Sequence, residues 1–111
     1  MGTHDHGADG RNADVLVYIN GVLRPRAEAM VSVFDSGFLM GDGVWEGLRL
    51  YNGRVPFLDE HLDRLFQGAK ALDLDIGMDR GALTEAIYET TRANNMKEGV
   101  HIRLMVTRGL K

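Results

Sequence analysis

A chain of 111 residues with a formal net charge of −3 and no cysteine has room for one domain with a modest core. The lack of cysteine excludes disulfides and thiolate metal sites, and an acidic balance without a basic stripe argues against nucleic acid as a partner. No apolar run approaches the roughly 20 residues of a membrane span, so we expect no membrane partner.

The first thirteen residues, 1–13, are predicted to be a disordered tail because they are polar, contain glycine and histidine, and show no periodicity. Two histidines there, His4 and His6, lie beside aspartates and form at most a weak chelating set, so we predict no metal site. The segment also lacks the apolar core of a secretory signal, and with the absence of cysteine this favours the cytoplasm. One domain is therefore expected over residues 14–111.

A β-hairpin is predicted at the start of this domain. Residues 15–19 are β-branched and aromatic, which favours a strand, and residues 22–24 return as its partner. Asn20-Gly21 between them is the preferred centre of a type I′ turn. Pro25 then ends the pairing or marks an edge.

A second strand is predicted over residues 44–51, after a segment rich in glycine and turn residues, 31–43. Asn52-Gly53 is another hairpin signal, so residues 54–57 are expected to be the return strand. The strand alternates between two faces, one carrying Val44, Glu46, Leu48 and Leu50, the other Trp45, Gly47, Arg49 and Tyr51.

Two helices and a last strand follow. Asp59 is predicted to cap the first helix and Asp79 to start the second, which stops at Asn94-Asn95; residues 100–107 form the strand. Hairpins followed by helices predict an α+β, two-layer domain with a mainly antiparallel sheet and two helices. The inward positions are Leu62, Leu65, Phe66, Ala69 and Leu72 in the first helix and Leu83, Ala86, Ile87 and Thr90 in the second.

Residues 32–65 carry a dense motif: D-x-G-x-x-x-G-D-G, then E-G-[IL]-R, Y-x-G and H-x-x-R-L. This pattern closely resembles the N-terminal signature of class IV aminotransferases, which are pyridoxal-phosphate enzymes of fold type IV. So many matched positions are far more specific than a lone glycine motif. They are Asp35, Gly37, Gly41, Asp42, Gly43, Trp45, Glu46, Gly47, Leu48, Arg49, Tyr51, Gly53, His61, Arg64 and Leu65.

The resemblance implies a homodimer of two-domain subunits with pyridoxal 5′-phosphate bound between the domains, this chain being the smaller N-terminal domain. Arg64 matches the arginine that holds the cofactor phosphate in that family, a role suited to a planar, permanently charged fork. By helix pattern alone, Arg64 would be an ordinary exposed arginine. His61, one turn earlier, is interpreted as a structural helix residue rather than a catalyst.

Trp45 and Arg49 match positions at the substrate pocket of this family. The resemblance implies that Trp45 lines the side-chain pocket, where Phe or Tyr is usual; the alternative is a core tryptophan. Arg49, in the EGLR run, matches a position common in the branched-chain group. It either supports the pocket or forms a salt bridge within the domain, for example with Glu46.

Three further positions complete the substrate set that the resemblance implies. His101 and Arg103 lie two apart on one face of the last strand and match positions that help to bind substrate carboxylates, although His replaces the usual Tyr. Met40 stands where some relatives place a pocket Tyr and offers an apolar wall instead.

No catalytic residue is predicted in this chain. The family's Schiff-base lysine lies in its second half, and none of Lys70, Lys97 and Lys111 matches that motif. The carboxylate that pairs with the cofactor pyridine nitrogen is also missing. The chain is therefore interpreted as a fragment without its C-terminal domain, inactive alone; the alternative is a natural stand-alone domain without catalysis.

The expected parent reaction transfers an amino group between a branched-chain L-amino acid and 2-oxoglutarate, because EGLR preceded by GDGVW resembles the branched-chain group. A D-amino-acid aminotransferase is an alternative, since Val106-Thr107-Arg108-Gly109 also suits that group. An aminodeoxychorismate lyase is a third. The non-enzyme alternative is a dimerisation or binding module, which would self-associate through an exposed apolar surface.

Overall fold

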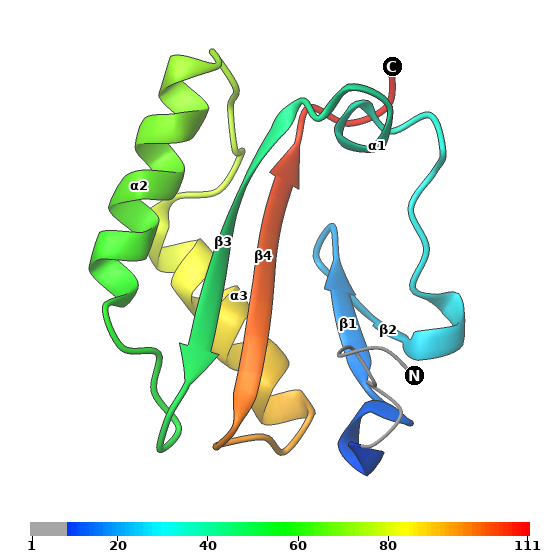
Figure 1. Cartoon of the computed structure of the whole chain (residues 1–111), viewed down its shortest axis with the longest axis vertical. Helices are drawn as coiled ribbons and strands as arrows, with labels where there is room; N and C mark the ends of the chain where they lie inside the picture. Colours follow the sequence, from blue (N-terminus) through cyan, green and yellow to red (C-terminus); the bar gives the residue numbers. More distant parts are fainter. Residues whose placement is uncertain (1–8) are drawn as a thin grey trace, which may run out of the picture.

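The computed structural model describes residues 9–111, and Figure 1 shows their arrangement. Histidines 4 and 6 of the weak chelating set lie outside the described residues. The elements are β1 Leu16–Ile19, β2 Val22–Pro25, α1 Ser36–Met40, β3 Gly43–Leu50, α2 Leu58–Ala71, α3 Arg80–Ala93 and β4 Val100–Thr107, with short 3-10 turns at Gly10–Asn12 and Arg26–Glu28.

The strands form two antiparallel ribbons, β1–β2 and β3–β4. The first is the predicted hairpin, and positive φ angles of 51° at Asn20 and 87° at Gly21 confirm the type I′ turn. The second pairs all eight residues of β3 with β4, from Gly43 opposite Thr107 to Leu50 opposite Val100. In Figure 1 the β1–β2 ribbon lies beside β4, and α1 lies at the end of β4 near the C-terminus.

The core lies between the β3–β4 ribbon and the two long helices. Leu48 and Leu50 of β3 are almost fully buried, as period-two alternation predicted. They pack against Leu62 and Leu65 of α2, and the cluster is completed by Val55, Leu83 and Ile87. Helices on one side of an antiparallel ribbon make a two-layer α+β domain, so the predicted fold class is confirmed.

The predicted return strand over residues 54–57 is wrong. After the turn at Asn52-Gly53, only one isolated bridge joins Tyr51 to Arg54. Val55 turns into the core, and its N–H donates to the Tyr88 hydroxyl at 3.1 Å instead of to a strand. Pro56 has no N–H to offer a ladder, and β4 pairs with β3 in place of this segment.

The ends of the helices also differ from the prediction in places. Helix α2 begins at Leu58, after Phe57 in a left-handed conformation, so Asp59 lies in the first turn and is not the cap. Asp79 does cap α3, accepting the Ala82 N–H at 2.7 Å. On α3, Thr91 rather than Thr90 is buried, because it lies one turn after Ile87 on the face that Leu83 and Ile87 turn to the core.

Residues 9–13 of the predicted disordered tail are structured. Asp9 caps the 3-10 turn Gly10–Asn12, and Arg11 donates to the carbonyl oxygens of Glu98 and Gly99 at 2.8 and 3.1 Å. Within the described part of the chain, no helix has the length and apolar character that a membrane crossing requires.

Candidate functional site

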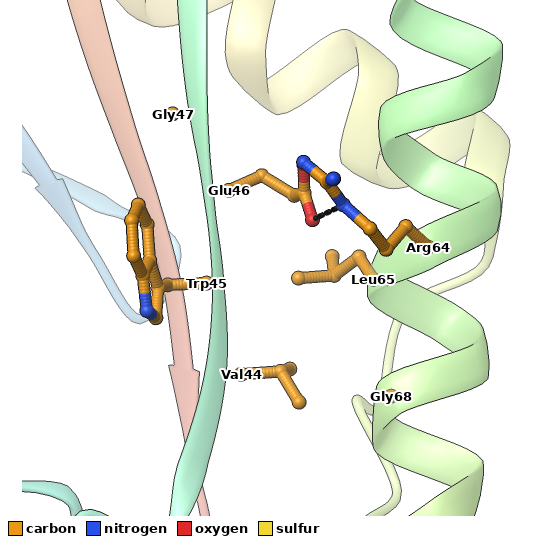
Figure 2. Close-up of a pocket in the computed structure, with 7 residues that line it drawn as sticks. All are labelled: Val44, Trp45, Glu46, Gly47, Arg64, Leu65 and Gly68. Carbon is orange, nitrogen blue, oxygen red and sulfur yellow. Dashed lines mark hydrogen bonds and ion pairs between the residues drawn. The ribbon is translucent and has the colours of Figure 1, made fainter.

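The structure pairs Arg64 of α2 with Glu46 of β3. Arg64 donates from Nε to Oε2 of Glu46 at 2.8 Å and from Nη2 to Oε1 at 2.7 Å, which is a two-pronged arginine–carboxylate contact (Figure 2). The suggested salt bridge between Glu46 and Arg49 is therefore wrong. Residues three apart on a strand point to opposite faces, and Arg49 is exposed on the face away from the helices.

His61 contacts the same carboxylate. Its Nδ1 lies 2.7 Å from Oε1 of Glu46, because His61 and Arg64 are one helical turn apart and face the same strand. The bond from Arg64 holds the pKa of the Glu46 carboxyl below its ordinary value; burial acts against this, and His61 adds to the lowering. Glu46 in turn raises the pKa of the Arg64 guanidinium.

Burial differs sharply across the pair. The Glu46 side chain is 3% exposed, whereas that of Arg64 is 73% exposed. Within residues 9–111, Arg64 donates hydrogen bonds only to the two oxygens of Glu46. These bonds use the N–H of Nε and one N–H of Nη2. A guanidinium carries five N–H donors, so the edge formed by Nη1 and the rest of Nη2 stays open to an anion.

An open groove of about 500 Å³ lies beside the pair. It follows the free edge of β3, and in Figure 2 Val44 and Leu65 point into the space between β3 and α2 while Trp45 points to the other side. Arg64 also lines a smaller hollow, together with Phe57, Glu60 and His61. The groove is lined by Val44, Trp45, Glu46, Gly47, Arg64, Leu65 and Gly68.

Four of the predicted substrate residues lie together on the exposed face of the β3–β4 ribbon. Arg49 is directly opposite His101, and Gly47 is opposite Arg103. The Arg103 guanidinium lies 4.3 Å from the centre of the Trp45 ring, within cation–π distance. This face combines an aromatic plane with cationic side chains, which suits a carboxylate attached to an apolar group.

The absence of a side chain at Gly47 leaves room for the imidazole of His101 on this face. A Cβ at this position would lie 3.2 Å from Cε1 of His101, tighter than most real contacts, so a side chain here would push the imidazole away. Met40 is placed elsewhere: it is exposed at the end of α1 and does not join the four residues on the ribbon.

Sequence reasoning assigned no site role to Glu46 and interpreted His61 as structural. A signal for Glu46 was present, because it alternates with Val44 and Leu48 on the face that packs in the core. An ionised carboxylate on such a face needs hydrogen-bond partners. The H-x-x-R motif on the neighbouring helix supplies two, His61 and Arg64. Among residues 9–111, no cluster of three or more metal-ligating side chains occurs.

A sequence model described as amino-transferase class IV matches residues 43–111, more than half of the chain. The chain belongs to the class IV aminotransferase family. It is 50% identical over 100 residues to branched-chain-amino-acid aminotransferase-like protein 1 of Arabidopsis thaliana, a match that covers 90% of this chain and 18% of that protein.

Solved structures agree in fold with this family member. The T.th. branched-chain amino acid aminotransferase in complex with N-(5′-phosphopyridoxyl)-L-glutamate superposes with a TM-score of 0.79 at 32% identity, covering 88% of this chain and 34% of that one. The branched-chain aminotransferase of Thermoproteus uzoniensis with norvaline gives 0.74 at 36% identity, covering 83% and 32%. The chain thus spans about a third of these proteins.

Two proteins with other activities are also similar to this chain. These are a D-alanine aminotransferase of Listeria monocytogenes and a 4-amino-4-deoxychorismate lyase of Pseudomonas aeruginosa. Both alternatives drawn from the sequence are thus represented among the relatives.

Proposed function

We propose that this chain is the N-terminal domain of a pyridoxal-phosphate-dependent aminotransferase that acts on branched-chain L-amino acids and 2-oxoglutarate. The observation that carries the proposal is the guanidinium of Arg64, which lines the groove and which Glu46 holds by one edge, leaving the N–H donors of Nη1 and one of Nη2 unused by Glu46. Such an edge matches two oxygens of a phosphate. The residues present therefore fit the phosphate end of the cofactor.

The proposed roles follow from where each side chain lies. When bound, the cofactor supplies an electron sink that stabilises negative charge at the substrate α-carbon. Arg64 anchors its phosphate, and Trp45 offers a flat apolar wall to the substrate side chain. His101 and Arg103 offer N–H donors and positive charge to a carboxylate, and Arg49 adds charge on the same face. Met40, the last residue of α1, is proposed as a second apolar wall of the substrate pocket.

Proton transfer to and from the substrate is assigned outside this chain. Lys70, Lys97 and Lys111 are exposed, and none of them lines the groove. The proposal therefore includes a C-terminal domain that supplies the lysine, and it predicts that the 111 residues alone are inactive.

Dimerisation and a cytoplasmic location are also part of the proposal. Exposed apolar side chains are concentrated in α1 and the segment before it, which supports an interface there. In the proposed full-length protein, the second subunit and the C-terminal domain would together bury these side chains. They are Met30, Val31, Val33, Phe34, Phe38, Leu39 and Met40, together with Leu110.

The test uses the natural gene product that carries these residues, whatever its length. Purified with pyridoxal 5′-phosphate, it is assayed for 2-oxoglutarate-dependent conversion of L-leucine, L-valine and D-alanine, and for release of pyruvate from aminodeoxychorismate. Faster turnover of the branched-chain L-substrates supports the proposal. Preference for D-alanine or for aminodeoxychorismate assigns it to one of the other two activities, and no turnover at all supports a non-catalytic module.

A further inference from the structure

We propose that Glu46 is a positioning residue, whose buried carboxylate, itself held by His61, sets the orientation in which Arg64 meets the cofactor phosphate. The inference rests on the proposed function, because it presupposes that Arg64 binds that phosphate. It adds separate roles for the three residues: Arg64 contacts the ligand, and Glu46 and His61 position Arg64.

The placement of Glu46 calls for such an explanation. It lies between Val44 and Leu48 on the packed face of β3, where an apolar side chain would bury without an electrostatic cost. A buried charge paired with a partner is often no more stabilising than a well-packed hydrophobic residue. Stability of the core alone therefore does not account for a carboxylate at this position.

The geometry of the pair supports an orienting role. Glu46 projects from a strand that is paired with β4 along its whole length, so its backbone is rigid. Arg64 projects from α2 on a long flexible stem and is mostly exposed. Two simultaneous bonds of 2.8 and 2.7 Å fix both the plane and the direction of the guanidinium, which reduces the side-chain entropy that ligand binding would otherwise cost.

His61 fixes the carboxylate in the same way. Its Nδ1 contacts Oε1, the oxygen that also receives Nη2 of Arg64, so one oxygen of Glu46 is held from two points on α2. The carboxylate therefore cannot rotate without losing contacts to both side chains. Glu46, His61 and Arg64 form one hydrogen-bonded unit, and Arg64 is the most exposed of the three side chains.

A double-mutant cycle on the full natural gene product tests this inference. The dissociation constant of pyridoxal 5′-phosphate is measured for wild type, Glu46→Gln, Arg64→Ala and the double variant, with Glu89→Gln, at an exposed position of α3, as the control. We expect Glu46→Gln to weaken binding about tenfold in the wild-type background, as loss of a supporting hydrogen-bond partner does. In the Arg64→Ala background the same change should cost under about twofold, since no guanidinium remains to be oriented.

The possible outcomes separate the two claims. An equal loss from Glu46→Gln in both backgrounds, or no loss in either, overturns the positioning role while leaving phosphate binding by Arg64 intact. If Arg64→Ala leaves affinity unchanged, the proposed function loses its anchor, and the positioning role is overturned with it.

A measurement on the wild-type protein covers the case in which Glu46→Gln does not fold. The Arg64 Nε–H, identified by its loss in Arg64→Ala, should exchange with solvent clearly more slowly than that of Arg24, an exposed arginine of β2. Exchange of the Arg64 Nε–H as fast as that of Arg24 would overturn the inference, because the guanidinium would then be mobile.

Discussion

Glu46 and Arg64, eighteen positions apart, meet at the free edge of β3 through two hydrogen bonds, and only the arginine is open to solvent. The relationship joins the strand layer to the helix layer at the point where the groove begins. Because the carboxylate is ionised and buried, the contact affects both stability and the geometry of the groove.

The first prediction concerns the pH dependence of stability. The pKa of Glu46 is lowered in the folded chain, so the unfolded chain binds a proton more readily. The contribution of the contact to the free energy of unfolding is fully present above the ordinary value of 4.5 and is lost as pH falls through the lowered folded value. In urea titrations from pH 7 to pH 3, the stability difference between wild type and Glu46→Gln should shrink in acid. A difference that stays constant would contradict this, and Glu89→Gln, at an exposed position of α3, is the control.

The second prediction concerns the core. Leu48 is fully buried against α2 and α3, so Leu48→Ala leaves a cavity and should lower the free energy of unfolding by about 2–5 kcal/mol. Leu72→Ala, at a half-exposed position at the end of α2, should change it by under about 0.5 kcal/mol. Chemical denaturation of the 111-residue chain measures both, and similar losses for the two variants would argue against the described core.

The third prediction concerns a close approach of backbone at the start of β3. A Cβ on Gly43 would lie 2.6 Å from the carbonyl oxygen of Val106, a backbone atom that cannot rotate away. Gly43→Ala should therefore destabilise the chain by about 1–3 kcal/mol. Gly10→Ala, with no atom within 4 Å of the added Cβ, is the matched control and should be nearly neutral. Equal thermal midpoints for the two variants would show that β4 is not where the structure has it.

The fourth prediction concerns the exposed face of the ribbon. Arg103→Gln in the natural gene product removes the charge next to Trp45. If Arg103 binds the substrate carboxylate as proposed, this change should raise KM for 2-oxoglutarate about tenfold, because a charged hydrogen bond would be lost. Arg24→Gln on β2, which lies in the other ribbon, is the control. Steady-state kinetics measure this, and an unchanged KM for Arg103→Gln would remove Arg103 from the carboxylate site.

Local chemistry made much of the fold predictable. Asn20-Gly21 defines its own turn, and Asp79 caps its own helix, so both were readable without knowledge of distant residues. The partner of β3 was not readable in this way. Residues 54–57 are adjacent in sequence, yet β4, about fifty residues later, pairs instead, and that choice depends on how α2 and α3 pack.

In the candidate site, too, local motifs could be read from the sequence, whereas contacts between distant residues could not. Arg64, Trp45 and Arg49 were predicted as site residues because they belong to a dense motif. His101 and Arg103 were predicted because they match family positions on the last strand. The contact between Glu46 and Arg64 depends on the distance between a strand and a helix, which no motif specifies. Period-two alternation did carry one clue, since it separates Glu46 from Arg49 and places the carboxylate on an apolar face.

The proposed binding of the cofactor phosphate by Arg64 can be tested by comparing a phosphorylated with an unphosphorylated ligand. The dissociation constants of pyridoxal 5′-phosphate and of pyridoxal are measured for the natural gene product and its Arg64→Ala variant. We expect the variant to lose about tenfold or more in affinity for the phosphorylated ligand and almost none for pyridoxal. Equal losses for both ligands, or no loss for either, would contradict it.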